Sequence, residues 1–274
     1  MPARPSPAVP PTGDEHQSEA APAAADPRFD YHAIPEGYYD RVLREGNPIR
    51  RLWHLSKFER VLDCLPAKDG GAILDIGCFA GTFLSLVAPD QFQRQLGVDI
   101  LPGQIDYANA NYGTPFRQFR HVDSITHLRG IDERFDCITL IEVIEHLDAG
   151  EIRTLLREVS RMLRPGGRLV LTTPNYASTW PILERILNRL SEVSYEEQHI
   201  TRFTYFNMLR RLGELHPEFP AEFSLELQTT THFITPFLAG LSFDAARRLS
   251  RTVPHRKWRH PFGNLVLMVL ARRD

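Results

Sequence analysis

Residues 72–83 read AILDIGCFAGTF, and the character of the chain changes twice along them. An apolar run leads into Asp75, glycines follow at positions 77 and 81, and a new apolar periodicity then begins. This order predicts a buried strand, a tight turn and the start of a helix. Glycine at such a turn allows a positive φ and a close approach of the backbone to a ligand, and the free N–H groups at the helix start attract electronegative ligand groups.

The turn is compatible with two kinds of ligand. A dinucleotide-binding turn has three glycines as G-x-G-x-x-G, so that a pyrophosphate can lie on the helix N-terminus. This chain has Gly77 and Gly81 only, and Asp75 lies two residues before the first of them. Because a carboxylate repels a pyrophosphate and suits a cationic, amine-bearing ligand, the charge favours S-adenosylmethionine over a nicotinamide cofactor.

The same residues resemble the first motif of the class I S-adenosylmethionine-dependent methyltransferases, Asp/Glu-x-Gly-x-Gly-x-Gly. The resemblance implies that Asp75, Gly77, Cys78 and Gly81 bind the cofactor. The chain departs from the motif at Phe79, where the family usually has glycine. Two other hypotheses therefore stay open here: a nicotinamide oxidoreductase, and a non-catalytic cofactor-binding module in which the Phe79 side chain blocks the pocket.

Predicted strands alternate with predicted helices downstream of the turn. The strands lie at 95–100, 116–122, 134–141 and 168–173, with helices at 103–111 and 149–163 between them. This alternation predicts right-handed crossovers and a doubly wound parallel sheet. In such a sheet the ligand crevice lies at the carboxyl ends of the strands.

Acidic residues stand at two of these strand ends. Asp99 can accept hydrogen bonds from both ribose hydroxyls, and Ile100 beside it is assigned to the same cofactor site. Asp123 and Ser124 follow the third predicted strand. In the methyltransferase family an acid at this place contacts the adenine amino group, so the resemblance adds both residues to the cofactor site.

Further motifs extend the resemblance to roughly residues 37–206 and the final strands: EVIEHL at 142–147, LRPGG at 163–167 and TPN at 173–175. It implies an α/β, Rossmann-like, doubly wound and mostly parallel seven-stranded sheet, with strands at 223–231 and 265–271 and the last one antiparallel. Two helices between 38 and 65 are expected to form an N-terminal helical lid. Trp53 and His54 could line the pocket, although a place in the core is the simpler expectation for Trp53. Insertions at about 176–204 and 233–261 are expected to form a helical substrate roof.

The strongest catalytic candidates are Glu142, Glu145 and His146, which would share one face if the segment were helical. Together with His199 they could hold a divalent metal, which would lower the pKa of an acceptor hydroxyl. Ubiquinone-biosynthesis O-methyltransferases and small-RNA 2′-O-methyltransferases, which this segment resembles, have a metal at such a Glu-x-x-Glu-His. Mg or Mn is the candidate ion, although imidazole ligands suit Mn²⁺ better. The alternative is metal-free: Glu142 lines the cofactor pocket, and Glu145, His146 and His199 act in catalysis or packing.

Composition limits the remaining choices. The formal charge of −2 selects no nucleic-acid partner. Three cysteines without a paired framework suggest reduced thiols and a cytoplasmic location. No apolar run approaches the length of a membrane span. Residues 1–27, rich in proline and alanine, are expected to be a disordered tail before a methyltransferase domain at 28–274.

These patterns predict a S-adenosylmethionine-dependent methyltransferase. The expected reaction is O-methylation of a small hydroxylated metabolite, a lipid-linked ring or a sugar. A metal-dependent RNA 2′-O-methyltransferase is the alternative. The basic stretch at 247–260 is compatible with an anionic substrate, although a solvated helix face and loop is the simpler interpretation. The sequence does not indicate the oligomeric state.

Overall fold

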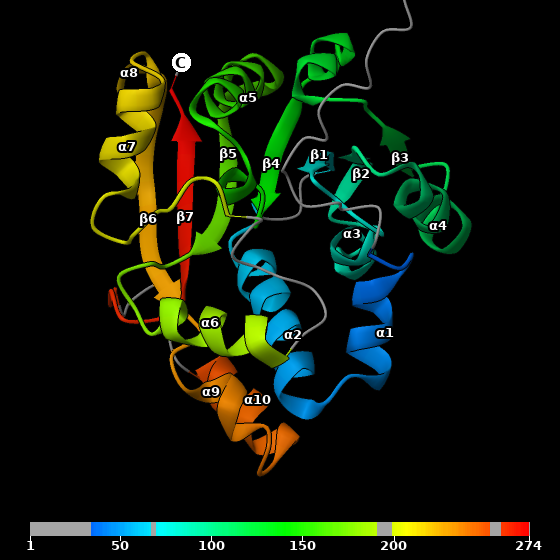
Figure 1. The fold of residues 1–274 in the computed structure, drawn as a ribbon. Coiled ribbons are helices and arrows are strands. Elements are labelled where there is room, and N and C mark those ends of the chain that lie inside the picture. The colour runs from blue at the N-terminus through cyan, green and yellow to red at the C-terminus, as the bar shows by residue number, and fades with distance from the viewer. Residues whose placement is uncertain (1–33, 67–69, 191–198, 253–258, 274) are drawn as a thin grey trace, which may run out of the picture.

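The computed structural model describes residues 34–66, 70–190, 199–252 and 259–273, and Figure 1 shows the arrangement of their helices and strands. In these residues seven strands form one sheet with the order β3-β2-β1-β4-β5-β7-β6. The strands are β1 (Gly71–Ile76), β2 (Phe92–Asp99), β3 (Arg117–His121), β4 (Phe135–Ile141), β5 (Leu163–Pro174), β6 (Phe223–Thr231) and β7 (Leu265–Arg272). The expected tail at 1–27 lies outside the described residues.

The first five strands in chain order are parallel, and the apolar β1 lies at their centre. It pairs with β2 on one side and with β4 on the other, so that Asp75 is level with Gly97 and Thr139. Both faces of β1 are covered, as its nearly continuous apolar sequence requires. The strand order reverses beside β1, and a crevice therefore opens at its carboxyl end.

Helices cover the two faces of the sheet and divide the core into two layers. On one face, α5 (Ala149–Met162) and α7 (Met208–Leu215) pack on Leu74, Ile138 and Met268. On the other face, α2 (Pro48–Leu62), α3 (Thr82–Leu86) and α4 (Pro102–Tyr112) pack on Ile73 and Cys137. Alternate residues of one strand therefore enter different layers.

The last strand, β7, is inserted between β5 and β6 and runs antiparallel to both. Its residues Leu265–Leu270 are all buried. Short α8 (Phe219–Glu222) comes directly before β6. The antiparallel insertion confirms the expected fold.

Several helices gather beyond the carboxyl ends of the parallel strands (Figure 1). They are α1 (Tyr38–Glu45), α2, α6 (Trp180–Leu190), α9 (Thr235–Leu238) and α10 (Phe243–Thr252). The break between α1 and α2 lies at Gly46–Asn47, and the Asn47 side chain caps α2 by accepting the Arg50 amide at 2.9 Å. Helices α9 and α10 pack on α2 through a small apolar cluster around Leu52. Helix α2, which belongs to the lid, therefore also supports the roof helices α9 and α10.

One local expectation was wrong. Residues 142–146 do not form an α-helix: Glu142 leaves β4 with φ 55°, and only a short 3₁₀ turn, η3 (Ile144–His146), follows. A second 3₁₀ segment, η2 (Ile125–Gly130), comes after β3. Residues 164–167 belong to β5, where Gly166 takes φ 73°. Helix α7 begins at Met208. None of the helices in the described residues is both long and apolar enough to cross a bilayer.

Candidate active site

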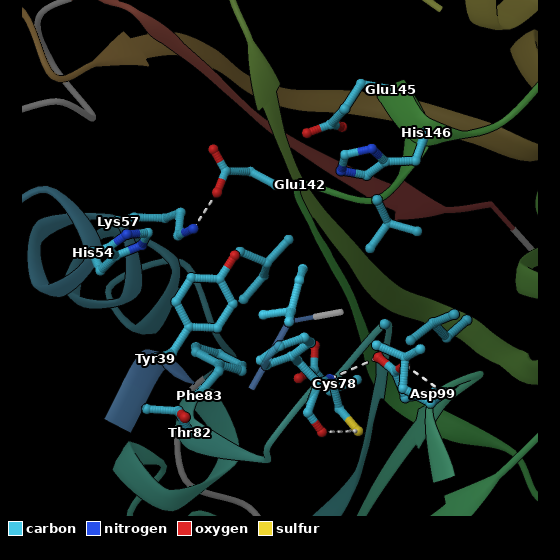
Figure 2. A pocket seen from close by; sticks show the side chains of 18 of the residues that line it. Tyr39, His54, Lys57, Cys78, Thr82, Phe83, Asp99, Glu142, Glu145 and His146 are labelled. Atoms are coloured by element: carbon cyan, nitrogen blue, oxygen red, sulfur yellow. Dashed lines mark hydrogen bonds and ion pairs between the residues drawn. The ribbon is translucent and has the colours of Figure 1, made fainter. Parts of the chain in front are cut away.

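A cavity of about 880 Å³ lies at the carboxyl ends of β1, β2 and β4, beneath the lid and the roof. Figure 2 shows part of its lining, with Asp99 at one end and Glu145 and His146 at the other. The volume falls in the upper range for ligand sites, enough for a nucleoside cofactor and a second small molecule. Both sets of sequence-predicted residues thus face one space.

The glycine turn forms the floor of the cavity. Gly77 and Gly81 have φ values of 77° and 74°, which only glycine adopts without strain. A Cβ atom at Gly77 would lie 2.5 Å from the Val143 side chain, so the backbone passes close to the β4 loop. The amides of Gly77 and Cys78 donate to the Val98 carbonyl, which fixes the turn to β2.

Phe79 lies in the cavity wall and leaves the space open. Its backbone is left-handed, with φ 49°, and its ring packs edge-on against Tyr39 of α1 with centroids 4.9 Å apart. The cavity beside it is lined by both Asp75 and Asp99. The hypothesis of a blocked pocket therefore has no support from the structure. Phe79 instead connects the glycine turn to the lid.

The two strand-end acids have different partners. The Asp99 carboxylate accepts the Phe79 amide at 2.7 Å and the Leu101 amide at 3.0 Å. Asp75 accepts the Thr139 hydroxyl at 2.6 Å. Burial raises the pKa of both carboxyls. For Asp75 the pKa reaches about 7: burial raises it most, the Thr139 hydrogen bond lowers it, and the nearby Asp99 charge raises it further. Asp75 is thus poised to change its charge near neutral pH.

The remaining predicted cofactor residues lie around the same floor. Cys78 is buried, and burial raises the pKa of its thiol well above its ordinary value, so the thiol stays neutral. Ile100 is half exposed on the cavity rim. Asp123 and Ser124 also line the cavity, and the Asp123 side chain is largely exposed between His121 and His127. The structure places all of these residues in the lining of the cavity.

Glu142 does not join the predicted metal set. Its carboxylate points toward Lys57 of α2 and forms an ion pair with it (Figure 2). Burial alone would raise the pKa of Glu142, but the adjacent ammonium outweighs burial and holds that pKa below its usual range. The strained φ at Glu142 separates the carboxylate from Glu145, which an α-helix would have kept on the same face.

Glu145, His146 and His199 do come together, and we call them the triad. One potential ligand atom from each lies within 4.8 Å of the others, and the two imidazole centroids are 5.2 Å apart. Glu145 is fully buried: Oε2 accepts the Thr173 hydroxyl at 3.0 Å, and Oε1 has no hydrogen-bond partner among the described residues. Burial raises the pKa of Glu145 to about 7.

Sequence reasoning missed Glu184 and Tyr176, which hold His199. The Glu184 carboxylate lies 2.6 Å from Nδ1 of His199, and the Tyr176 hydroxyl donates to Glu184 at 2.9 Å. Burial lowers the pKa of His199, but the Glu184 hydrogen bond and the charge of Glu145 outweigh burial, so the net shift is upward. A signal existed in the sequence: on the helical period of α6, position 184 falls on the same face as Trp180 and Leu183.

Comparison with known proteins gives the family. A sequence profile of the family described as "Methyltransferase domain" matches residues 50–215, which is more than half of the chain. The chain belongs to this methyltransferase family. The match includes the glycine turn, both strand-end acids and the triad.

Two relatives of this methyltransferase illustrate the range of the family. It is 32% identical over 127 residues to nodulation protein S of Rhizobium tropici, covering 46% of this chain and 51% of the relative. It is 33% identical over 121 residues to a ubiquinone biosynthesis O-methyltransferase of Bradyrhizobium diazoefficiens, covering 43% and 46%. The alignment spans about half the length of these curated relatives.

Solved structures share the fold of this methyltransferase. A putative methyltransferase in complex with the Trm112 activator of Haloferax volcanii has a TM-score of 0.57 at 16% identity, over 86% of this chain and 98% of that one. The N-methyltransferase NodS of Bradyrhizobium japonicum bound to S-adenosylhomocysteine has a TM-score of 0.50 at 19% identity, over 85% and 91%. At these identities the likeness concerns the fold alone.

The triad of this methyltransferase fits a divalent cation. It offers one carboxylate and two imidazoles as possible metal ligands. Oε1 of buried Glu145 has no hydrogen-bond partner among the described residues and could coordinate a metal ion. The Glu184 carboxylate at Nδ1 of His199 leaves Nε2 as the ligand atom, which is the usual arrangement around a metal-bound imidazole. Two nitrogen ligands suit Mn²⁺ or Zn²⁺ better than Mg²⁺, which prefers oxygen.

Proposed function

We propose that this protein transfers the methyl group of S-adenosylmethionine to a hydroxyl oxygen of a small molecule. The observation that supports this best is that one cavity holds both a carboxylate pair beside a glycine turn and the triad. Asp75, Asp99 and the turn would bind the adenosyl sulfonium. The triad would receive the acceptor hydroxyl. Family membership supports the methyl transfer, and the chemistry of the triad supports oxygen as the acceptor atom.

The reaction is a direct displacement. The acceptor oxygen attacks the methyl carbon, the S–CH₃ bond breaks, and its electron pair stays on sulfur to give S-adenosylhomocysteine. The hydroxyl proton passes to the triad, where the pKa of Glu145, at about 7, suits a base at neutral pH. Holding the acceptor in line with the methyl carbon supplies most of the remaining acceleration.

A divalent metal at Glu145, His146 and His199 would lower the pKa of the acceptor hydroxyl when bound. Glu184 and Tyr176 would orient His199 for this role whether or not a metal takes part. The alternative of an RNA 2′-O-methyltransferase gains no support from the relatives described above.

Methyl transfer from labelled S-adenosylmethionine to extracts of the source cell, resolved by chromatography, tests the proposal. Asp99→Ala should weaken cofactor affinity by about 1–3 kcal/mol, because the ribose hydroxyls lose a charged acceptor. Unchanged affinity in calorimetry would remove Asp99 from the site. Assays after exhaustive chelation, with and without added Mn²⁺, decide on the metal: full activity without metal would leave the triad as base and structure.

A further inference from the structure

Exposed apolar side chains are concentrated on the roof. Half of the large apolar side chains that the described residues expose to solvent come from α6, α9, α10 and the loops beside them. Figure 1 shows these helices gathered at one end of the molecule, beyond the sheet. Folded monomers rarely expose such side chains together unless the surface binds a partner. We call the following side chains the apolar roof surface: Ile182, Phe233, Ile234, Phe237, Leu241, Leu249 and Phe262.

The packing of α9 and α10 explains which side chains remain outside. Ala239, just after α9, and Ala246 of α10 are buried in the small cluster on α2, and Ser250 of α10 is buried beside them. Arg248 is exposed, and on the helical period it lies opposite positions 246 and 250 and so projects away from α2. Leu241, in the turn between the two helices, is 89% exposed. The outward side of the roof therefore carries both apolar and positively charged side chains.

The roof is positively charged, although the chain as a whole is not. Its segments 176–190, 232–252 and 259–264 contain six arginines against two acidic residues, Glu184 and Asp244, which gives a formal charge of +4 where the whole chain has −2. Glu184 is buried, so its charge does not face the solvent. Arg247 is paired with a glutamate of α2. Arg248 and Arg251 are exposed and form no ion pair within the part of the chain that the structure describes. Their charges are available to an anionic partner.

Phe237 connects the apolar roof surface to the cavity. It is 37% exposed and also contributes to the cavity lining. Its ring centroid lies 6.4 Å from that of Trp53, which is half buried in the lining and does not occupy the place in the core that was the simpler expectation. Ile49 lines the cavity as well, and its Cδ1 atom lies 3.5 Å from where a Cβ atom of Gly240 would be. The apolar roof surface therefore borders the cavity.

A bilayer surface that contains anionic lipids fits this combination of groups. Aromatic and aliphatic side chains enter the boundary between headgroups and acyl chains, while arginines contact the negatively charged headgroups. A fluid bilayer also accepts protruding side chains without a complementary surface, and Leu241 and Phe262 protrude, at 89% and 64% exposure. A nucleic acid would contact the arginines through its phosphates but would leave the aliphatic side chains in water.

We propose that the roof binds to the surface of a bilayer containing anionic lipids. Leu241, Leu249 and their apolar neighbours enter the headgroup region, and Arg248 and Arg251 contact lipid phosphates. The arginines attract the protein to the bilayer over about one Debye length, roughly 8 Å at physiological salt, and the apolar side chains then hold it there. This inference goes beyond methyl transfer and does not depend on it.

Sedimentation of the full chain with lipid vesicles tests the inference. One set of vesicles contains phosphatidylcholine alone, and the other contains about one third phosphatidylglycerol. We expect binding to the anionic vesicles to be at least about tenfold tighter, because only these attract the arginines. High salt should weaken this binding without abolishing it, since the apolar contribution is not screened. Light scattering without vesicles gives the oligomeric state: a dimer that Leu241→Ser dissociates would assign the surface to a second copy and overturn the inference.

Two matched pairs of variants locate the binding. Leu249→Ser on α10 and Leu209→Ser on α7 change side chains that are 44% and 40% exposed, and only the first should weaken binding, about three- to tenfold, because α7 lies away from the roof (Figure 1). Arg248→Gln should weaken binding to anionic vesicles about fivefold, whereas Arg157→Gln, at an exposed position on α5, should leave it unchanged. Thermal unfolding checks that all four variants fold. Equal binding to both kinds of vesicle, no binding to the anionic vesicles, or equal effects within either pair would each overturn the inference.

Discussion

Asp75 and Asp99 show how one residue type acquires two roles from its neighbours. Asp99 accepts two backbone amides, from Phe79 and Leu101, and so fixes the glycine turn as well as facing the cavity. Among the described residues, the hydrogen-bond partner of the Asp75 carboxylate is a hydroxyl, that of Thr139, and burial raises the pKa of Asp75 to about 7. The sequence predicted both positions at strand ends, but not this division, because the partners come from loops and neighbouring strands.

The raised pKa of Asp75 predicts that cofactor affinity depends on pH. A bound sulfonium favours the charged carboxylate, so binding releases a proton and should tighten as pH rises from 6 to 8, by several-fold. In Asp75→Asn this rise should flatten. Calorimetry across that range measures it, with S-adenosylhomocysteine, which lacks the sulfonium charge, as a weaker responder. An equally steep rise in the variant would contradict the assignment.

The raised pKa of Asp75 also makes the free energy of unfolding of the ligand-free protein depend on pH. Because the folded protein binds the Asp75 proton more tightly than the unfolded chain does, the contribution of this group is present below pH 4 and is lost as pH rises through 7. Asp75→Asn should therefore make the free energy of unfolding less dependent on pH between 4 and 7. Urea unfolding at several pH values checks this.

At the scale of elements, the segment after β4 shows the limit of spacing arguments. Glutamates at 142 and 145 and a histidine at 146 suit one face of a helix, but the chain turns sharply at Glu142 and continues as 3₁₀. Lys57 of α2 forms an ion pair with the carboxylate of Glu142. A contact made by a residue so distant in sequence overrides local periodicity, and the motif alone gives no sign of it.

Helix α6 contributes a positioning residue that can be tested. Glu184→Gln keeps the shape of the side chain but removes the charge beside Nδ1 of His199, so the pKa of His199 should fall. We expect slower turnover, a shifted pH–rate profile and, if a metal binds, affinity lowered about tenfold. The exposed Glu214→Gln serves as a control. A merely structural role would lower stability without moving the pH profile.

A buried carboxylate helps to attach helix α1 to α3 and α4. Asp40 accepts hydrogen bonds from Thr82 of α3 at 2.6 Å and from Tyr107 of α4 at 3.0 Å, and also from the Tyr112 hydroxyl. Asp40→Ala leaves these hydroxyls without their acceptor, so we expect a loss of about 2–3 kcal/mol in the free energy of unfolding. Denaturant titration measures it against Asp106→Ala, an exposed position on α4. Equal stabilities would show that the lid does not depend on Asp40.

Across the whole molecule, the sheet was more predictable than the roof. Continuous apolar runs such as those of β1 and β4 indicate strands that are buried on both faces, and the bounds of β6 match the prediction. The antiparallel insertion of β7 came from resemblance to a family, since its own residues do not encode direction. A helical roof was expected at 233–261, but the bounds of α9 and α10 could not be predicted, because these helices form against α2 and their short sequences carry little signal alone.

This architecture predicts an uneven response to ligand. S-adenosylmethionine at 100 times its Kd should stabilise the folded state by about 2.7 kcal/mol, and openings that expose the cavity should be suppressed most. Hydrogen exchange followed by mass spectrometry should therefore slow in α1, α2 and residues 76–83, all of which contribute residues to the cavity lining. Helices α7 and α8, which do not line it, should exchange at nearly unchanged rates. Protection of α7 and α8 with none in α1 would place the ligand elsewhere, because a cofactor held by Asp75 and Asp99 necessarily restrains the lid that packs on Phe79.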